Sequence, residues 1–263
     1  SYVIPSLADT FRREFSANSN YHALQLKVEK RMSRGLSLLA SYLWSKTISD
    51  ARGGADAGGT AAGAVQDKNN FRAEKSLADE HFPHRFVMSS NYDLPWGRGR
   101  ALLGSMPKWA DLLIGQWAVG GILTLNSGRR LNIGVQGDPA NVGGGAAPRP
   151  DVVPGQNPIL SGDQRSLARW FNTDAFVRQA SFTFGNASRN PAQAPGLRNL
   201  DLAIYKVFAL GERRSLQLRG EFFNASNTPF FSAPGSSLGL AQFGLINGAA
   251  DARIIQFGLK FNF

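Results

Sequence analysis

The stretch at residues 253–263, RIIQFGLKFNF, decides the fold because it alternates strictly between apolar and polar or small side chains after its first two residues. Alternate side chains of an extended chain point to opposite faces, so one face is wholly apolar: Ile255, Phe257, Leu259, Phe261 and Phe263. The length fits a strand tilted across a bilayer, which takes about 9 to 11 residues. Standing alone, the stretch would more often be a half-buried strand of a soluble β-sandwich. Its aromatic tip favours the last strand of an outer-membrane β-barrel, with Phe257, Leu259, Phe261 and Phe263 as the barrel-assembly signal.

Composition excludes several classes of protein. The 263 residues include no cysteine, which excludes disulfide scaffolds and thiol catalysis. No run of 18 apolar residues is present, so a helical membrane protein is excluded. The mean hydropathy of −0.21 does not separate a soluble protein from a barrel, because a barrel alternates lipid-facing with lumen-facing residues. The formal net charge is +10, but the basic residues are scattered and no base-stacking module accompanies them, so we expect no nucleic-acid partner.

The same alternation recurs upstream and predicts six further strands. They are centred on residues 24–28, 36–44, 84–93, 117–125, 200–208 and 216–222. The pattern allows the fourth strand to continue past Ser127 through Leu131, Ile133 and Val135, which would make it long and bent. Lys206 interrupts the apolar face of the fifth strand, and its stem can lie along lipid while its ammonium reaches the interface.

Connection lengths predict the orientation of these strands, since bacterial barrels have short periplasmic turns and long external loops. The tight connections at residues 32–35 and 210–213 then fall in the periplasm. The long connections fall outside: residues 49–83, 136–197 and 226–252. The exception is a long periplasmic connection at residues 94–116, whose apolar patch predicts a short amphipathic helix at the membrane interface.

Seven strands are an unusual count, because a bacterial single-chain barrel has an even number of at least eight strands. An unpaired strand edge is untenable in lipid. We therefore expect either an eighth strand, at residues 2–15 or 176–184, or further strands in sequence upstream of Ser1. The first residues include neither an initiating Met nor a signal peptide, so we expect the chain to be the end of a longer protein.

Several motifs resemble one family of transporters. Residues 18–50 read NSNYHALQLKVEKRMSRGLSLLASYLWSKTISD, and further pieces follow in order: HRFVMSSNYDLPWGRGR from His84, RWFNTDAF from Arg169, FGNASRN from Phe184, RNLDLAIYK from Arg198 and LRGEFFNASNTPFF from Leu218. Together they resemble the late barrel of Oar-like TonB-dependent outer-membrane transporters. The resemblance runs from Asn18 to Phe263.

This resemblance implies an all-β, antiparallel transmembrane barrel in the bacterial outer membrane, importing a bulky solute. Members of the family have 22 strands, an N-terminal plug and a TonB-contacting segment. Residues 1–263 would be a single C-terminal barrel segment without the plug and the TonB-contacting segment. The implied partners are outer-membrane lipid, the barrel-assembly machinery, the rest of the barrel with its plug, and TonB through the missing N-terminal part. The alternatives are a small self-contained barrel and a soluble β-sandwich module that binds carbohydrate or protein through its long loops.

No motif indicates an enzyme or a cofactor. Asp79, Glu80, His81 and His84 are metal-ligand residue types, but Pro83 opposes the helix that would align them, so the metal signal is weak. The Gly-rich residues 53–63 lack the Lys-Ser/Thr ending of a phosphate-binding loop, and we expect an ordinary external loop.

Two further sets of residues are assigned by strand parity. The polar faces carry charged and polar side chains that we expect to line the lumen, and some of them to pair across neighbouring strands: Lys27, Glu29, Arg85, Asp201, Arg219, Glu221 and Lys260. Aromatic residues near strand ends are expected at the membrane interfaces: Tyr42, Trp44, Trp96, Trp117 and Tyr205.

Overall fold

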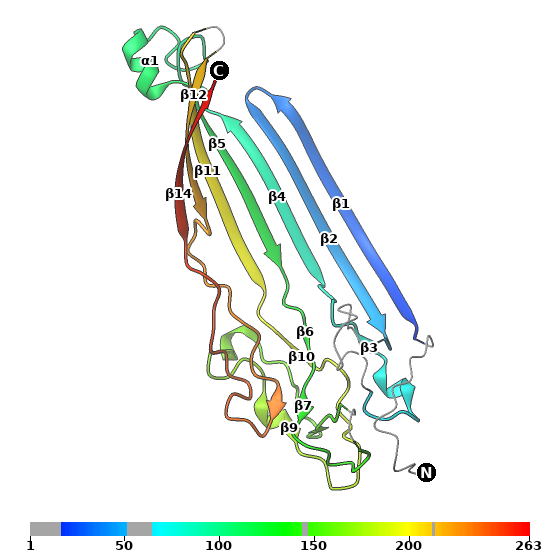
Figure 1. The fold of residues 1–263 in the computed structure, drawn as a ribbon. Helices are drawn as coiled ribbons and strands as arrows, with labels where there is room; N and C mark the ends of the chain where they lie inside the picture. The colour runs from blue at the N-terminus through cyan, green and yellow to red at the C-terminus, as the bar shows by residue number, and fades with distance from the viewer. Residues whose placement is uncertain (1–16, 52–64, 144–146, 212–213) are drawn as a thin grey trace, which may run out of the picture.

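The computed structural model describes residues 17–51, 65–143, 147–211 and 214–263, and its main element is one antiparallel sheet. Seven long strands follow one another as a meander, and we call them the wall (Figure 1). Their bounds are β1 (Ser19–Ser33), β2 (Leu36–Ser49), β4 (His84–Asp93), β5 (Trp117–Asn126), β11 (Leu197–Ala209), β12 (Ser215–Phe223) and β14 (Ile254–Asn262). A short strand, β3 (Ser76–Leu77), pairs with the end of β2. All seven strands predicted from the alternation are therefore confirmed.

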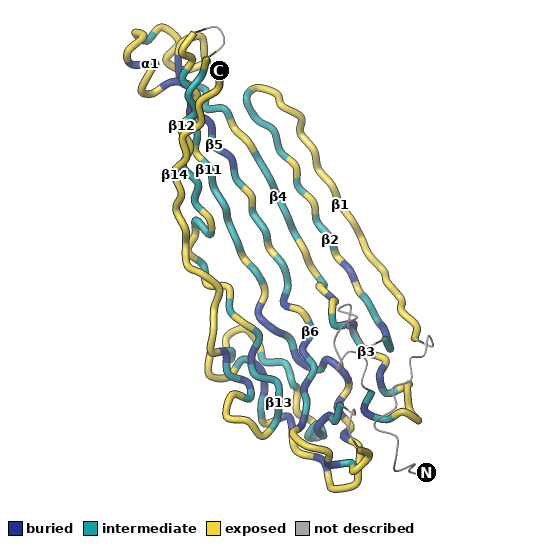
Figure 2. The backbone as a smooth tube through the Cα atoms, viewed as in Figure 1, coloured by how far each residue is buried: buried dark blue, intermediate teal, exposed yellow. Residues whose placement is uncertain are grey.

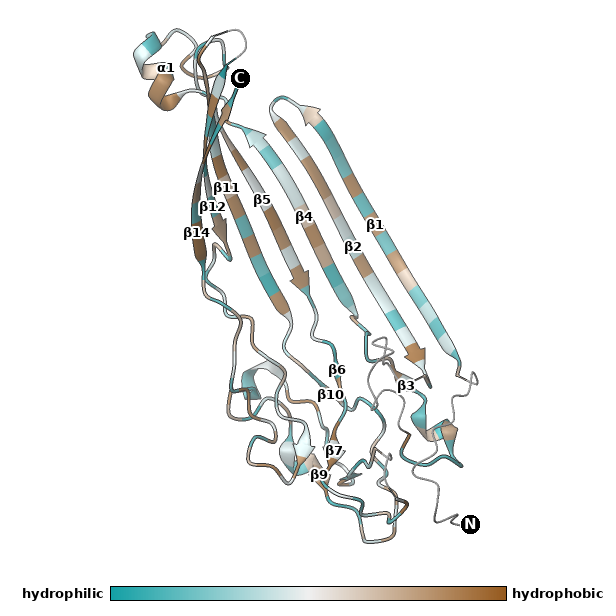
Figure 3. Cartoon of the chain, in the orientation of Figure 1, coloured by the Kyte–Doolittle hydropathy of each residue, from teal (hydrophilic) through white to brown (hydrophobic). Residues whose placement is uncertain are grey.

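The pairing register joins the apolar positions of all strands into one continuous face, which we call the apolar face. Residues directly opposite each other in an antiparallel pair lie on the same side of the sheet. One such row crosses six strands: Leu38, Ser90, Gly121, Leu202, Phe222 and Ile255. Along each strand, apolar and polar residues alternate, which is visible as bands in Figure 3. A slip of one residue in any pair would break this continuity.

The apolar face of the wall is uncovered over most of its area. Val28 in β1 is 60% exposed and Phe257 in β14 is 76% exposed. Figure 2 shows both outer strands exposed along their whole length. A β-sandwich would need a second large sheet over this face, whereas the other described sheets have two strands each. The β-sandwich alternative is therefore wrong.

The two ends of the wall differ, and we call them the turn end and the loop end. At the turn end, β1 and β2 are joined by Arg34 and Gly35, whose φ values of 51° and 78° fit a two-residue type I′ hairpin. The helix α1 (Lys108–Ile114) and the end of β14 lie at the same end (Figure 1). The helix predicted within residues 94–116 is thus present. None of the described helices is long and apolar enough to cross a membrane.

At the loop end, the chain forms short strands that do not belong to the wall. The strand β6 (Arg130–Leu131) pairs with β10 (Ala192–Gln193), and β7 (Gly134–Val135) pairs in parallel with β13 (Ser237–Leu238). The expected continuation of the fourth strand through Val135 is therefore wrong. The chain leaves the wall at Gly128, where a Cβ atom would lie 1.7 Å from the carbonyl oxygen of Ala194.

One of the two candidates for an eighth wall strand lies among the loops. Residues 176–184 contribute only β9 (Phe176–Val177), which pairs with β8 (Asp151–Val152) among the loops, so this candidate is wrong. The other candidate, residues 2–15, lies outside the described residues. Three 3-10 helices complete the loop end: η1 (Phe71–Glu74), η2 (Gly162–Gln164) and η3 (Thr173–Ala175).

Candidate functional site

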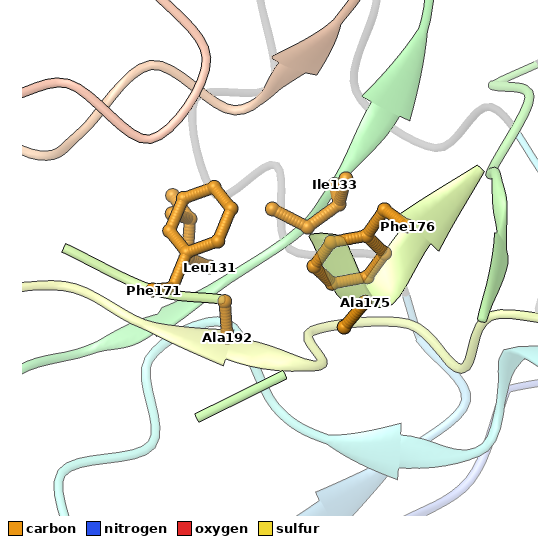
Figure 4. Packing of buried hydrophobic residues seen from close by; sticks show 6 residues of the cluster. All are labelled: Leu131, Ile133, Phe171, Ala175, Phe176 and Ala192. Atoms are coloured by element: carbon orange, nitrogen blue, oxygen red, sulfur yellow. The ribbon is translucent and has the colours of Figure 1, made fainter. Parts of the chain in front are cut away.

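The described parts of three long loops pack together at the loop end of the wall and form what we call the loop unit. They are the first loop (residues 50–83), the second loop (residues 127–196) and the third loop (residues 224–253). A small apolar core holds the second loop together: Leu131, Ile133, Phe171, Ala175, Phe176 and Ala192 (Figure 4). Phe243 of the third loop packs edge-on against Phe171, with the ring centroids 5.2 Å apart. Edge-to-face rings at this distance attract each other, so the second and third loops are fixed to one another.

A buried ion pair joins the first loop to the second. Nη1 of Arg149 lies 2.9 Å from each carboxylate oxygen of Glu74, and the two side chains are 1% and 0% exposed. Gln66 completes the link: its Oε1 accepts from the Arg149 N–H at 2.7 Å, and its Nε2 donates to the Gly185 carbonyl at 2.8 Å. Breaking one partner of such a pair leaves an uncompensated buried charge. Sequence reasoning missed these residues, because 75 positions separate Glu74 from Arg149.

The second loop is also tied to the wall itself. Nη2 of Arg189 donates to the Ser49 carbonyl at the end of β2, with 2.9 Å between the atoms. Nδ2 of the neighbouring Asn190 donates to the Leu77 carbonyl in β3 at 2.8 Å. These contacts hold the loop unit at a fixed position above the loop end.

Two of the residues with metal-ligand side chains, Asp79 and His81, are bound to different partners. Asp79 accepts from Nδ2 of Asn190 at 2.5 Å, whereas Nδ1 of His81 accepts from the Thr47 N–H at 3.3 Å. The structure brings no group of three or more His, Asp or Glu into a metal-binding arrangement within its described ranges. The whole Gly-rich stretch at residues 53–63 falls in the gap at 52–64, outside those ranges.

The charged residues assigned to the lumen lie on the face of the wall opposite the apolar face, which we call the polar face. Lys27 pairs with Glu29 at 3.1 Å, and Arg219 pairs with Glu221 at 3.0 Å. Both ion pairs run along a strand, so the hypothesis that these residues pair across strands is wrong. The reason is the register, which places Ser41, not a carboxylate, opposite Lys27.

The remaining polar-face residues make other contacts. The carboxylate of Asp201 accepts from the Asn224 N–H and from Nδ2 of Asn199, each at 2.9 Å. Arg85 and Lys260 share this face by register, near the loop end and the turn end respectively.

The aromatic residues divide between the two ends of the wall and between its faces. Tyr42 and Trp44 lie on the apolar face toward the loop end, and Trp117 lies on it at the turn end. Trp96 lies in the connection beside α1, where its carbonyl accepts a hydrogen bond from the Gln116 N–H at 3.2 Å. Tyr205 is one residue out of step with the apolar positions of β11 and lies on the polar face.

Lys206 differs from expectation. Its side chain lies under α1 instead of along open lipid, and the residue is only 2% exposed. Nζ donates to the Asp111 carbonyl at 3.2 Å and to the Gly115 carbonyl. Trp117 adds a second contact, since its Nε1 donates to the Leu113 carbonyl at 2.9 Å. The helix is therefore docked on the apolar face, with the side chains of Trp109, Leu112, Leu113 and Ile114 exposed.

Comparison with known protein families identifies the architecture. A family model described as an outer membrane beta barrel domain matches residues 1–256. No curated protein and no solved structure matches the chain. In such barrels the apolar face meets lipid and the polar face lines the interior, and the two faces of the wall have this character. The chain belongs to the family of outer membrane beta barrel domains and is located in the bacterial outer membrane.

Proposed function

We propose that this chain is the C-terminal part of the barrel of a TonB-dependent transporter, which imports a bulky solute. The observation that carries the proposal is the open wall: β1 pairs only with β2, and β14 only with β12, among the described strands. Unpaired backbone groups are costly in lipid, so both edges need partner strands. A larger barrel would supply them, and the resemblance to Oar-like transporters between Asn18 and Phe263 indicates which kind of barrel.

The loop unit supports a receptor role at the external mouth. A hollow of about 370 Å³ lies where the three loops meet the wall, and each loop contributes to it: Phe82 from the first, Arg129 from the second and Phe230 from the third. Its floor includes Asn126 and Leu197, which lie on the polar face by register. Pockets of about 300 to 1,000 Å³ are typical of ligand sites. We assign this hollow to contact with the solute.

The remaining roles follow from the same proposal. The polar-face charges would line the pore and face the plug. Phe257, Leu259, Phe261 and Phe263 would act as the signal for the barrel-assembly machinery, because β14 offers this machinery an exposed apolar strand with a free edge. TonB would act through the plug and would not touch this chain.

The proposal can be tested by following which compounds cells remove from the medium. The wild-type strain, a strain lacking the gene and a strain lacking TonB would grow on a mixture of oligosaccharides, oligopeptides and chelated iron. Mass spectrometry of the spent medium would measure their depletion. We expect at least one bulky compound to be depleted by the wild type and by neither mutant.

Two results would contradict the proposal. Depletion that needs the gene but continues without TonB would indicate a diffusion pore. No difference between the wild type and the gene deletion for any compound would indicate that the barrel does not import these classes of solute.

A further inference from the structure

Basic side chains cap the apolar face at its loop end. His22, Lys46, His84 and Arg198 lie in β1, β2, β4 and β11, at or just beyond the last apolar residue of each strand. Their register partners place them on the apolar face: His22 is opposite Lys46, His84 is opposite Trp44, and Arg198 is opposite Leu125. These basic residues therefore lie on the outer, lipid-facing side of the barrel.

Acidic residues are absent from this face. The seven wall strands contain four carboxylates: Glu29, Asp93, Asp201 and Glu221. All four occupy register positions of the polar face. A solvated surface would mix both signs of charge. Because the polar face carries cations such as Lys27 and Arg85 beside its carboxylates, the apolar face differs from it by having basic residues alone at its loop end, and these require a specific explanation.

Two hollows lie beside this basic row. The larger, which we call the rim hollow, has a volume of about 870 Å³ and includes these side chains: Tyr42, His84, Phe86, Arg165, Trp170 and Arg198. The smaller, of about 540 Å³, is lined by His22, Trp44, Lys46 and Arg130 among others. None of the described residues that line either hollow is Asp or Glu.

The rim hollow combines cations with apolar rings. The Arg165 guanidinium lies over the Trp170 ring, with 5.4 Å between its central carbon and the ring centroid. The Tyr42 hydroxyl is 2.8 Å from Nδ1 of His84. The guanidinium of Arg198 forms no ion pair with any residue that the structure describes, and Arg198 is exposed at the edge of the hollow. An anion with an attached apolar part would satisfy both kinds of lining.

The position of the hollow along the strand matches the outer headgroup level. From Trp117 to Leu125 the apolar alternation of β5 spans nine residues, within the about 9 to 11 residues that a tilted strand needs to cross a bilayer. Arg198 lies opposite Leu125, so it stands where the acyl chains end and the headgroups begin.

We propose that the rim hollow binds the phosphorylated headgroup of an anionic lipid of the outer leaflet, whose acyl chains lie along the apolar face below it. Arginine suits this ligand, because its planar guanidinium can donate two parallel hydrogen bonds to one phosphate. Asn126 and Leu197 of the polar face also line the hollow, but its cation Arg198 and its rings Tyr42 and Phe86 lie on the apolar face, which favours a lipid over the solute of the transporter. The binding would fix the loop unit to the membrane surface.

The test uses the full-length protein purified from outer membranes and delipidated in detergent. Diphosphorylated lipid A would be titrated in, and native mass spectrometry would count retained lipid molecules for the wild type, Arg198→Gln and Arg165→Gln. The matched control is Arg85→Gln, because Arg85 neighbours His84 at the same height but lies on the polar face. We expect each hollow variant to weaken retention about tenfold or more, and the control to equal the wild type.

Heat-modifiable gel mobility would show that every variant is folded. The proposal is overturned if Arg85→Gln weakens retention as much as Arg198→Gln, because overall charge would then explain binding. It is equally overturned if lipid A lacking both phosphates is retained as well, or if millimolar inorganic phosphate displaces the lipid completely. Retention of lipid A without phosphates would indicate apolar adsorption. Complete displacement by inorganic phosphate would indicate a site for free anions.

Discussion

Nζ of Lys206 in β11 donates a hydrogen bond to the backbone carbonyl of Asp111 in α1, with 3.2 Å between the two atoms. The Asp111 carbonyl also accepts from the Gly115 N–H at 2.9 Å, so the ammonium lies at the C-terminal end of the helix, where the helix dipole favours a cation. A lysine on a lipid-facing surface would otherwise be costly. The contact therefore explains both why α1 sits on the wall and why β11 tolerates a charge.

Replacing Lys206 with Met should release α1 without unfolding the wall. The Gly115 carbonyl would lose the Lys206 donor, at a cost of about 1 to 3 kcal/mol, while the Asp111 carbonyl would keep the Gly115 N–H. We expect trypsin to cleave the connection faster, at Arg98, Arg100 or Lys108. Lys260→Met removes a lysine from the polar face and should leave the cleavage rate unchanged. Equal protection of the connection in both variants would show that Lys206 does not hold the helix.

The two faces of the wall should respond oppositely to a new charge. An arginine on the lipid face at mid-bilayer costs about 2 to 4 kcal/mol, so Leu218→Arg and Phe257→Arg should reduce the folded, heat-modifiable fraction in outer membranes. Gln217 neighbours Leu218 in β12 but lies on the polar face, and Gln217→Arg should leave this fraction close to that of the wild type. Equal tolerance at both faces would contradict the assignment of the lipid face.

The wall was predictable because every strand meets the same two environments. Alternation is imposed on each strand separately, so it could be found in β14 without knowing its partner β12. The prediction stopped short at the loop end of β2, where Lys46 to Ser49 still pair with β1 but the apolar alternation has ended. Hydrogen bonding continues there beyond the lipid, and a hydropathy pattern does not detect it.

The loop unit could not be predicted, because its order comes from contacts between distant residues. Glu74 and Arg149 have no local pattern around them, and the strands β6 to β10 are two residues long and too short to show a period. Tyr205 and Lys206 show a second limit. The alternation predicts their positions along β11. The role of Lys206 depends on the docking of α1, which the sequence of β11 does not indicate.

The buried pair of Glu74 and Arg149 should be the most sensitive point of the loop unit. Glu74→Gln leaves the guanidinium buried without its counter-charge, which typically costs about 3 to 5 kcal/mol. We expect hydrogen exchange across the first and second loops to accelerate strongly, while the amides in the middle of β11 and β12 stay protected. Mass spectrometry of exchanged peptides would separate the two regions.

The exposed pair of Arg169 and Asp174 provides the control. It has a shorter distance, 2.7 Å, but both side chains are solvent-exposed. Exposed pairs contribute about 0 to 1 kcal/mol, so Asp174→Asn should change exchange little. If Asp174→Asn and Glu74→Gln accelerate exchange equally, burial does not govern the strength of these pairs.

The contact between Thr47 and His81 should make the loop end of β2 sensitive to pH. Burial, and then the positive charges of Arg130 and Lys46, lower the pKa of His81 below the 6.5 of an unperturbed histidine. As the pH falls below 6.5, the opened state therefore binds a proton that the closed state does not, and closing is destabilised by up to about 1.4 kcal/mol per pH unit. This loss continues until the pH reaches the lowered pKa, and the full stability is present above pH 6.5.

The free energy of opening at the Thr47 amide should therefore decrease with acidification, since histidine titrates in this range. Hydrogen exchange between about pH 7.5 and 5.5, corrected for intrinsic rates, would measure this free energy. Glutamine can accept the same hydrogen bond without titrating, so His81→Gln should flatten this dependence. His22→Gln, which changes an exposed histidine of β1, should preserve it. A pH dependence that survives in His81→Gln would mean that another group controls the opening, because no proton could then be taken up at position 81.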